Sequence, residues 1–145
     1  MSDYLDASAL VAVLLREPAR DSVQQLLQSS QSRPAVSSFC LGECSAAITG
    51  LVAMARKTEV EATALLAGLD QWIAASAIVG EVLDTDISEA TRIVRRFDLK
   101  LRLPDAVHVA TSRRMGLRLV TLDRRMATAA RMLGVACINP AETSV

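Results

Sequence analysis

Three aspartates in this sequence of 145 residues share a context that could support metal-ion chemistry. Asp6 ends the segment Tyr-Leu-Asp and precedes a helical pattern, and Asp123 ends Leu-Val-Thr-Leu-Asp before another helical pattern. Asp105 follows Pro104 in the first turn of a third predicted helix. The carboxyl ends of parallel strands share one edge of a sheet, and ligands bind in the crevice outside it. We therefore expect Asp6 and Asp123 to lie near one crevice if their strands are parallel neighbours.

Each aspartate also has a purely local explanation. Aspartate is a preferred residue at the amino-terminal cap of a helix, where it accepts a backbone N–H bond worth about 0.5–2 kcal/mol. Negative charge in the first turn also interacts favourably with the helix dipole. Capping is the simpler interpretation of each residue taken singly, so a functional role depends on all of them occurring together.

Glu43 is the fourth candidate acid. It lies about one turn into the helix predicted after a strand at residues 35–38, so it can reach the same edge of the sheet. Ala46 and Ala47, three and four residues later, surround it with small apolar side chains and not with a row of charges. The alternative interpretation, that Glu43 is an ordinary solvent-exposed glutamate on a helix, carries equal weight.

A cluster of these acids would need a compensating charge. Carboxylates that converge without Lys or His partners repel one another, and this repulsion costs stability. Mg²⁺ and Mn²⁺ prefer oxygen ligands and usually keep several waters that a substrate can displace. One or two such ions can activate a water, neutralise a phosphate and stabilise a leaving oxygen. The four acids therefore predict a metal-dependent enzyme that needs no nucleophilic side chain.

Two hydroxyls and the single histidine lie close to these acids in the sequence. Ser8 and Thr121 each lie two positions from an acid, so their hydroxyls could hold a carboxylate or a metal-bound water. Local capping by Ser and Thr is the alternative for both residues. His108 follows Asp105 by three positions, and we expect it to be a partly buried surface residue.

Charge is distributed unevenly along a chain whose formal net charge is zero. Residues 92–131 contain eleven Lys and Arg residues and three aspartates, a net charge of +8, so the remainder carries −8. Such asymmetry indicates a polyanionic partner, although arginines on solvated helix faces would give the same count. Arg124 and Arg125, directly after Asp123, are candidate contacts for such a partner.

Size and composition indicate one globular domain. A chain of this length can bury a core of its own, and 51% of its residues are hydrophobic while only 3% are aromatic. The Ala-, Leu- and Val-rich mixture favours helices over an all-β sandwich. No apolar stretch is long enough to span a bilayer, and the acidic start lacks the positive charge of a signal peptide. We expect a cytoplasmic protein with reduced cysteines at Cys40, Cys44 and Cys137.

Short apolar segments alternate with helical patterns through the whole chain. Strands are predicted at residues 3–6, 35–38, 82–83, 118–121 and 135–138. Helices are predicted at residues 7–15, 19–28, 39–55, 58–77, 104–115 and 124–133, with one more that Ser88 caps and that carries Ile93, Val94 and Phe97. This alternation, without an internal repeat or a linker, predicts a single α/β domain over residues 1–145 with a mostly parallel central sheet.

Four blocks of the sequence resemble the PIN-domain nucleases, and within them the VapC-type toxins of bacterial and archaeal toxin–antitoxin pairs. Tyr-Leu-Asp-Ala-Ser-Ala-Leu resembles the opening block of the family, with Asp6 as its acid. Ser-Ser-Phe-Cys-Leu-Gly-Glu is similar to the second block, with Glu43. Leu-Pro-Asp-Ala-Val-His resembles the third block, with Asp105, and Leu-Val-Thr-Leu-Asp-Arg-Arg the fourth, with Asp123. The blocks occur in order over almost the whole chain, so together they are far more specific than any one of them.

The resemblance implies a three-layer α/β/α PIN-like fold and an endoribonuclease that hydrolyses RNA phosphodiesters with Mg²⁺ or Mn²⁺. It implies that the catalytic and metal-binding residues are Asp6, Glu43, Asp105 and Asp123. Ser8 and Thr121 would support these acids, and Arg124 and Arg125 would contact RNA. The resemblance also implies a homodimer and a cognate VapB-type antitoxin whose tail covers the acidic groove.

Two other functions are open alternatives. A haloacid-dehalogenase-like phosphatase also places an aspartate after its first strand, but that family has a second acid two positions later, where this chain has Ser8. A non-catalytic PIN-like domain that only binds a partner is the other alternative, and the presence of all four acids argues against it. Metal-dependent cleavage of a mixed RNA pool would distinguish an enzyme from such an inactive domain.

Overall fold

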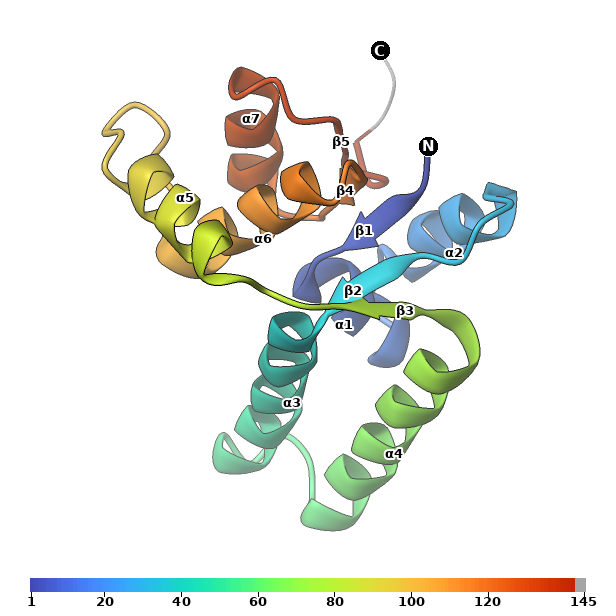
Figure 1. Ribbon diagram of the computed structural model, residues 1–145. Coiled ribbons are helices and arrows are strands. Elements are labelled where there is room, and N and C mark those ends of the chain that lie inside the picture. Colours follow the sequence, from blue (N-terminus) through green and yellow to red (C-terminus); the bar gives the residue numbers. More distant parts are fainter. Residues whose placement is uncertain (143–145) are drawn as a thin grey trace.

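Five short strands form one sheet in which all neighbours are parallel. The computed structural model describes residues 1–142. Its strands are β1 (Asp3–Leu5), β2 (Ala35–Ser37), β3 (Ile78–Gly80), β4 (Arg118–Val120) and β5 (Cys137–Ile138). Their order across the sheet is β3-β2-β1-β4-β5, with β1 at the centre (Figure 1). The predicted parallel sheet is therefore confirmed.

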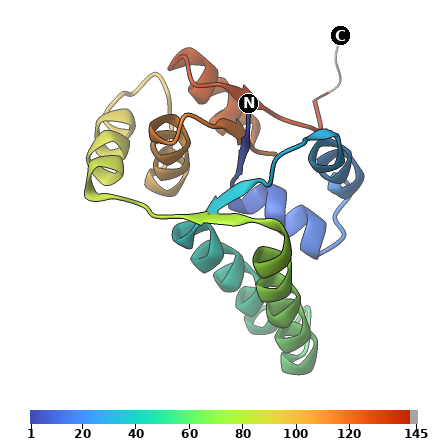
Figure 2. The ribbon, with the colours of Figure 1, turned by 45° about the vertical axis from the view of Figure 1, so that its right-hand side comes forward.

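Helices cover both faces of this sheet. The helices of residues 1–142 are α1 (Ala7–Leu14), α2 (Arg20–Ser29), α3 (Ser38–Ala53), α4 (Glu59–Ser76), α5 (Asp84–Val94), α6 (Leu103–Arg114) and α7 (Arg124–Met132). Helices α1 to α4 pack on one face and α5 to α7 on the other, and the α3–α4 hairpin projects away from α5 to α7 (Figure 2). The predicted three-layer α/β/α architecture is confirmed.

Alternation along the strands divides the core between the two faces. Tyr4 of β1 and Leu119 of β4 are buried in the core that α5, α6 and α7 share. Their neighbours Leu5 and Val120 are buried in the core on the side of α1 to α4. Successive side chains of a strand point to opposite faces, so strands of three residues can serve two cores. Because both faces are covered, most residues of β1, β2 and β4 are apolar and buried, and the polar residues Asp3, Ser37 and Arg118 lie at strand ends.

The order in which strands are added to the sheet reverses at β1. It runs from β1 outward through β2 to β3, and then crosses back to add β4 and β5 on the opposite side of β1. Asp6 directly follows β1, and its backbone N–H donates to Val120 O of β4 at 3.1 Å. Asp6 and Thr121 therefore lie at the carboxyl ends of two adjacent strands, at the switch point where open parallel sheets bind ligands.

The third strand is not where the sequence pattern placed it. It is β3, Ile78–Gly80, and the prediction of a strand at residues 82–83 is wrong. Val79 pairs with Val36 of β2, yet Ile78 and Val79 are half-exposed because β3 is an edge strand. An edge strand made only of apolar residues lacks the alternation of apolar and polar residues that identifies a strand. The predicted helix at residues 58–77 therefore ran up to the start of β3.

The start of α5 also differs from the prediction. Ser88 does not cap this helix, because the helix begins at Asp84 and Ser88 lies inside it. The side chain of Asp86 accepts the backbone N–H of Leu83 at 2.9 Å and so closes the first turn. Phe97 lies beyond the end of α5 and is 94% exposed, so it is not part of the predicted apolar face.

The other predicted elements are present, with ends that differ by at most two residues. Gly116 and Gly134 follow α6 and α7 with φ of 67° and 71°, which is the left-handed conformation that glycine adopts most easily. Cys40, Cys44 and Cys137 are free thiols, as predicted; Cys40 and Cys44 are buried in the core and Cys137 is half-buried. No helix within residues 1–142 combines enough length with enough apolar character to cross a bilayer.

Candidate active site

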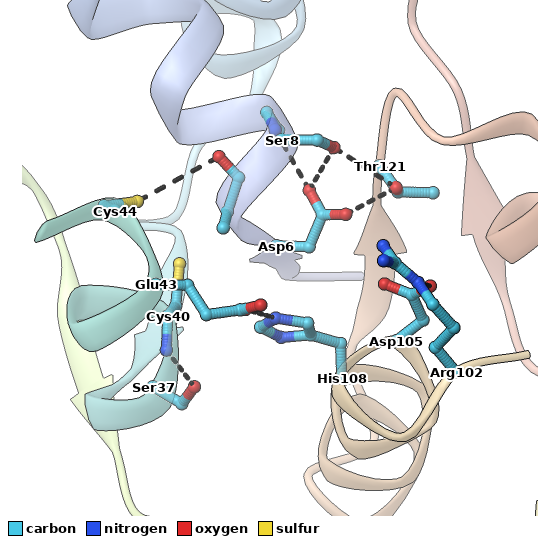
Figure 3. A network of polar contacts seen from close by, with 12 residues as sticks. Asp6, Ser8, Ser37, Cys40, Glu43, Cys44, Arg102, Asp105, His108 and Thr121 are labelled. Atoms are coloured by element: carbon cyan, nitrogen blue, oxygen red, sulfur yellow. Dashed lines mark hydrogen bonds and ion pairs between the residues drawn. The ribbon is translucent and has the colours of Figure 1, made fainter. Parts of the chain in front are cut away.

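Asp6 is the buried centre of the acidic group at the carboxyl edge of the sheet. Its side chain is 1% exposed. Oδ1 accepts from Ser8 Oγ at 2.7 Å and from the backbone N–H of Ala9 at 3.0 Å, and Oδ2 accepts from Thr121 Oγ1 at 2.5 Å (Figure 3). Burial raises the pKa of Asp6 above its usual value, because these hydrogen bonds do not fully offset the desolvation of the charge. Among the described residues, Asp6 forms no ion pair with Lys or Arg.

The hydroxyls of Ser8 and Thr121 connect Asp6 to the turn between β4 and α7. Ser8 Oγ accepts the backbone N–H of Leu122 at 3.0 Å, and Thr121 Oγ1 accepts that of Asp123 at 3.1 Å. Each hydroxyl then donates its proton to one carboxylate oxygen of Asp6. Two backbone amides are thus linked through two hydroxyls to one carboxylate, which fixes the position of Asp6 relative to Asp123.

Asp123 is the amino-terminal cap of α7. Its Oδ1 accepts the backbone N–H groups of Arg125 and Met126 at 2.9 and 3.1 Å. Asp6 likewise caps α1 through Ala9, so the capping interpretation holds for both residues. Capping does not occupy Asp123 Oδ2, which has no hydrogen-bond partner within residues 1–142.

Asp105 lies in the first turn of α6 and is held differently. It makes no capping hydrogen bond, because the helix starts from Arg102 without a side-chain cap. Arg102 Nε approaches its Oδ2 only at 3.9 Å, and the Arg102 side chain is 81% exposed. Burial raises the pKa of Asp105, and the negative charges of Asp123 and Glu43 raise it further. The capping interpretation is therefore wrong for Asp105. Its carboxyl group lies close enough to Asp123 and Glu43 for their charges to affect its pKa.

Glu43 reaches toward the same edge from α3 and contacts His108 of α6. Its carboxylate bonds His108 Nε2 across the space between the two helices (Figure 3). The expectation that His108 is a surface residue is wrong, because it is 1% exposed. Tyr4 Oη bonds its Nδ1 at 2.8 Å, and the ring of Phe39 lies 5.4 Å from the His108 ring. No local sequence signal shows that β1, α3 and α6 converge on this histidine.

The donor chemistry of the four acids fits a hard divalent cation. All four offer carboxylate oxygens, and the pKa values of Asp6 and Asp105 are raised by burial. A divalent cation favours the ionised forms and would supply the missing positive charge. Within residues 1–142, however, no three acidic, His or Cys side chains lie close enough together to hold one ion. Glu43 is bonded to His108 and Asp6 to its hydroxyls, so the four acids gather at one edge without forming a closed coordination shell.

Arg124 and Arg125 extend this edge with positive charge. Both are exposed in the first turn of α7, directly after Asp123. They line an open groove together with Lys100 and Asp98, which belong to the segment before α6. Asp98 is neutralised by Arg96, which donates to both carboxylate oxygens at 3.2 and 2.7 Å. The free charge of the groove is therefore positive.

Comparisons with known proteins agree on one family. A family model described as "PIN domain" matches residues 4–132. Ribonuclease VapC46 of Mycobacterium tuberculosis is 33% identical over 140 residues, which cover 94% of this chain and 96% of that protein.

Solved structures share the fold. DNA-bound VapBC from Salmonella typhimurium superposes with a TM-score of 0.75 at 16% identity, over 97% of this chain and 99% of that chain. VapC20 of Mycobacterium tuberculosis, described as a sarcin-ricin loop cleaving toxin, has a TM-score of 0.67 at 20% identity, over 88% and 95% of the two chains. At these identities the two structures establish the fold alone.

Proposed function

Because this chain belongs to the PIN-domain family, we propose that it is a Mg²⁺- or Mn²⁺-dependent endoribonuclease and the toxin of a type II toxin–antitoxin system. The name of its relative, Ribonuclease VapC46, supports this reaction. The observation that carries the proposal is the burial of Asp6 at the switch point of the sheet without a cationic partner. Family membership argues against the phosphatase alternative, and we treat residues 1–145 as a single nuclease domain.

The residues that would hold the cation are Asp6, Glu43, Asp105 and Asp123. When bound, Mg²⁺ or Mn²⁺ supplies an activated water and neutralises charge on the phosphate and on the leaving oxygen. The raised pKa values of Asp6 and Asp105 support this assignment, because a bound cation favours the ionised form of a carboxyl group whose charge is disfavoured by burial.

The chain's own groups orient the acids. Ser8 and Thr121 hold both oxygens of Asp6, so this carboxylate has one orientation before substrate arrives. Asp123 presents Oδ2 while its Oδ1 is fixed by the first turn of α7. Preorganised charge of this kind needs no rearrangement when the reaction begins. Asp105 has the fewest contacts and is the acid best able to adjust.

RNA would approach along the groove beside α7. Arg124 and Arg125 would contact its phosphates, and Lys100, which lines the same groove, would add a third positive charge. Phosphate contacts position a nucleic acid without reading its sequence, so this groove sets the path of the strand and not the choice of base.

Two protein partners belong to the same proposal. One is a cognate VapB-type antitoxin, which would cover the acidic edge; the existence of such a partner is supported by the likeness to VapBC from Salmonella typhimurium. Self-association as a homodimer is supported by exposed apolar side chains on β3 and at the start of α5, namely Ile78, Val79, Leu83 and Ile87. A concentration-independent monomer mass in sedimentation would contradict the dimer.

The experiment is cleavage of a mixed RNA pool by purified, antitoxin-free protein. Cleavage should occur with Mg²⁺ or Mn²⁺, stop in excess EDTA and return when the metal is restored in excess. Equal cleavage in EDTA would overturn the metal dependence. Absence of cleavage under every metal condition would favour the inactive partner-binding domain.

A further inference from the structure

His108 lies between the hydroxyl of Tyr4 and the carboxylate of Glu43, and neither its burial nor its contacts were expected from the sequence. We propose that His108 is a positioning residue that holds Glu43 at the acidic edge and is itself held by Tyr4. This inference rests on the proposed function, in which Glu43 is a metal ligand. It concerns a residue of the core that would never touch the metal or the RNA.

The contacts form one continuous chain of hydrogen bonds. The backbone N–H of Cys40 donates to Ser37 Oγ at 3.1 Å, and Ser37 Oγ lies 2.9 Å from Tyr4 Oη. Tyr4 Oη lies 2.8 Å from His108 Nδ1, and His108 Nε2 bonds the carboxylate of Glu43. Tyr4, Ser37 and His108 are each at most 1% exposed, so water does not compete for these bonds.

The two ends of the chain fix the direction of every bond for a neutral imidazole. An ionised carboxylate only accepts, so His108 Nε2 must carry the proton that is donated to Glu43. Nδ1 is then an acceptor and needs the hydroxyl proton of Tyr4. Burial raises the pKa of Tyr4 and keeps that proton in place. Tyr4 Oη then accepts from Ser37, whose Oγ already accepts from a backbone amide that can only donate.

Packing prevents the imidazole from turning away from Glu43. The rings of Tyr4 and Phe39 lie 5.8 and 5.4 Å from the ring of His108, tilted by 55° and 46°. Glu43 by contrast has a flexible side chain that is 29% exposed, and no contact other than His108 fixes its carboxylate within residues 1–142. The longest of the four acidic side chains is therefore held by a buried histidine. Partners that orient a metal ligand in this way typically account for about 10–100-fold in metal affinity.

A matched pair of substitutions separates the two nitrogens of the ring. The amide of His108→Gln can place an N–H near the position of Nε2, where it still donates to Glu43. The shorter amide of His108→Asn can reach only the position of Nδ1, where it still accepts from Tyr4. Glu43 is thus held in the Gln variant and released in the Asn variant.

The measurement is Mn²⁺ affinity by calorimetry on the metal-free protein without RNA, alongside thermal melting. We expect His108→Asn to weaken Mn²⁺ binding about 10–100-fold and His108→Gln to recover most of that loss. In a Glu43→Gln background, the Asn substitution should cost little more, because the ligand it positions is already gone. A purely structural role would instead lower the melting temperature of both variants and leave the Mn²⁺ affinity of the folded protein unchanged.

Tyr4→Phe tests the same chain while it keeps the ring, and it serves if His108→Asn does not fold. Loss of the hydroxyl should weaken Mn²⁺ binding about two- to tenfold, the range for one neutral hydrogen bond. Wild-type affinity in Tyr4→Phe and in a folded His108→Asn, with weak binding in Glu43→Gln, would overturn the inference and leave the proposed function intact. A wild-type protein that neither binds Mn²⁺ nor cleaves RNA would overturn both.

Discussion

The two ends of strand β1 each bury an aspartate against strand β4, and they compensate its charge in opposite ways. At the amino end, Asp3 pairs in register with Arg118, whose Nε and Nη2 donate to Oδ1 and Oδ2 at 2.7 and 3.2 Å. At the carboxyl end, Asp6 receives only neutral donors, chiefly Thr121. Both aspartates are 1% exposed, so burial does not distinguish them. They differ in counter-charge, because Asp3 is paired with Arg118 and Asp6 is paired with no Lys or Arg among the described residues.

A second buried acid behaves like Asp3. Asp86 is 2% exposed, and Arg114 Nε lies 2.8 Å from its Oδ1. Burial alone would raise the pKa of Asp86, but the hydrogen bonds from Arg114 and the backbone N–H of Leu83 bring it below the usual value. The pKa values of Asp6 and Asp105 are instead raised above the usual value. Asp3 and Asp86 are thus paired with arginine at close range, whereas Asp6 has no arginine partner within residues 1–142 and Asp105 has only Arg102 at 3.9 Å.

The largest expected effect is on cleavage. Asp6→Asn and Asp105→Asn should each lower RNA cleavage by more than about 100-fold, because direct ligands matter more than the residues that orient them. Asn at position 6 keeps the bond from Ala9 and nearly the same shape, and its amide can donate to Thr121 Oγ1, which reverses the direction of that bond while the charge is lost. Asp3→Asn is the matched control and should cleave like wild type. Full activity in either edge variant would reduce that residue to a structural role.

The same three variants should rank in the reverse order for stability. Asp3→Asn leaves Arg118 without its partner and should cost about 2 kcal/mol, less than a fully buried pair because the Arg118 side chain is 31% exposed. In thermal melting without metal this is a fall of about 5 °C. Asp6→Asn and Asp105→Asn should melt at or above the wild-type temperature, since each removes a negative charge that burial disfavours. A large loss of stability in the edge variants would show that their charge is compensated within the fold.

The pH dependence of stability should differ in sign between Asp6, whose pKa is raised, and Asp86, whose pKa is lowered. A folded-state pKa raised above the unfolded value makes the folded protein bind more protons, so stability falls as pH rises through that interval. The melting temperature of metal-free wild type should therefore fall as pH rises above the usual aspartate pKa of about 4, and this fall should be smaller in Asp6→Asn. Asp86, with its lowered pKa, loses its contribution only below the usual aspartate range near about 4. Unchanged slopes in Asp6→Asn would argue against the raised pKa.

The smallest expected effect is on the salt dependence of RNA binding, and it distinguishes arginines that are paired within the fold from those that are not. Arg118 serves Asp3, whereas Arg124 and Arg125 form no ion pair within residues 1–142 and line the groove. Arg124→Glu should flatten the dependence of log affinity for single-stranded RNA on log salt by about 0.7 for each phosphate that Arg124 binds. Arg56→Glu, an equal charge change at an exposed position after α3, should leave the slope unchanged. Equal slopes in both variants would place the RNA elsewhere.

Sequence reasoning reached those features of the edge that depend on local patterns. Asp6 and Asp123 each follow a short apolar strand, and the rule that parallel strands end at one edge was enough to expect them near each other. Their hydroxyl neighbours Ser8 and Thr121 could be identified by spacing alone. The predicted position of Asp105 in the first turn of α6 is also correct, and the alternative of a helix cap fails because Leu103 and Pro104 begin the helix before it.

Features that depend on long-range packing could not be predicted. The chain from Tyr4 through His108 to Glu43 joins β1, α6 and α3, and no periodicity within any one of them shows that they meet. The pairing of Asp3 with Arg118 depends on the register of β1 against β4, which strands of three residues do not specify. Both features require the assembled sheet.

Metal-induced stabilisation tests the central contrast most directly. Metal-free wild type, Asp3→Asn and Asp105→Asn are melted with increasing Mn²⁺, and the gain in melting temperature is compared. The free energy of unfolding of wild type and of Asp3→Asn should rise by about 2.7 kcal/mol when Mn²⁺ is at a hundred times its dissociation constant. Their melting temperatures should rise accordingly, and that of Asp105→Asn should rise far less. Equal gains in all three variants, or none in wild type, would contradict the claim that the uncompensated acids at the carboxyl edge bind the metal.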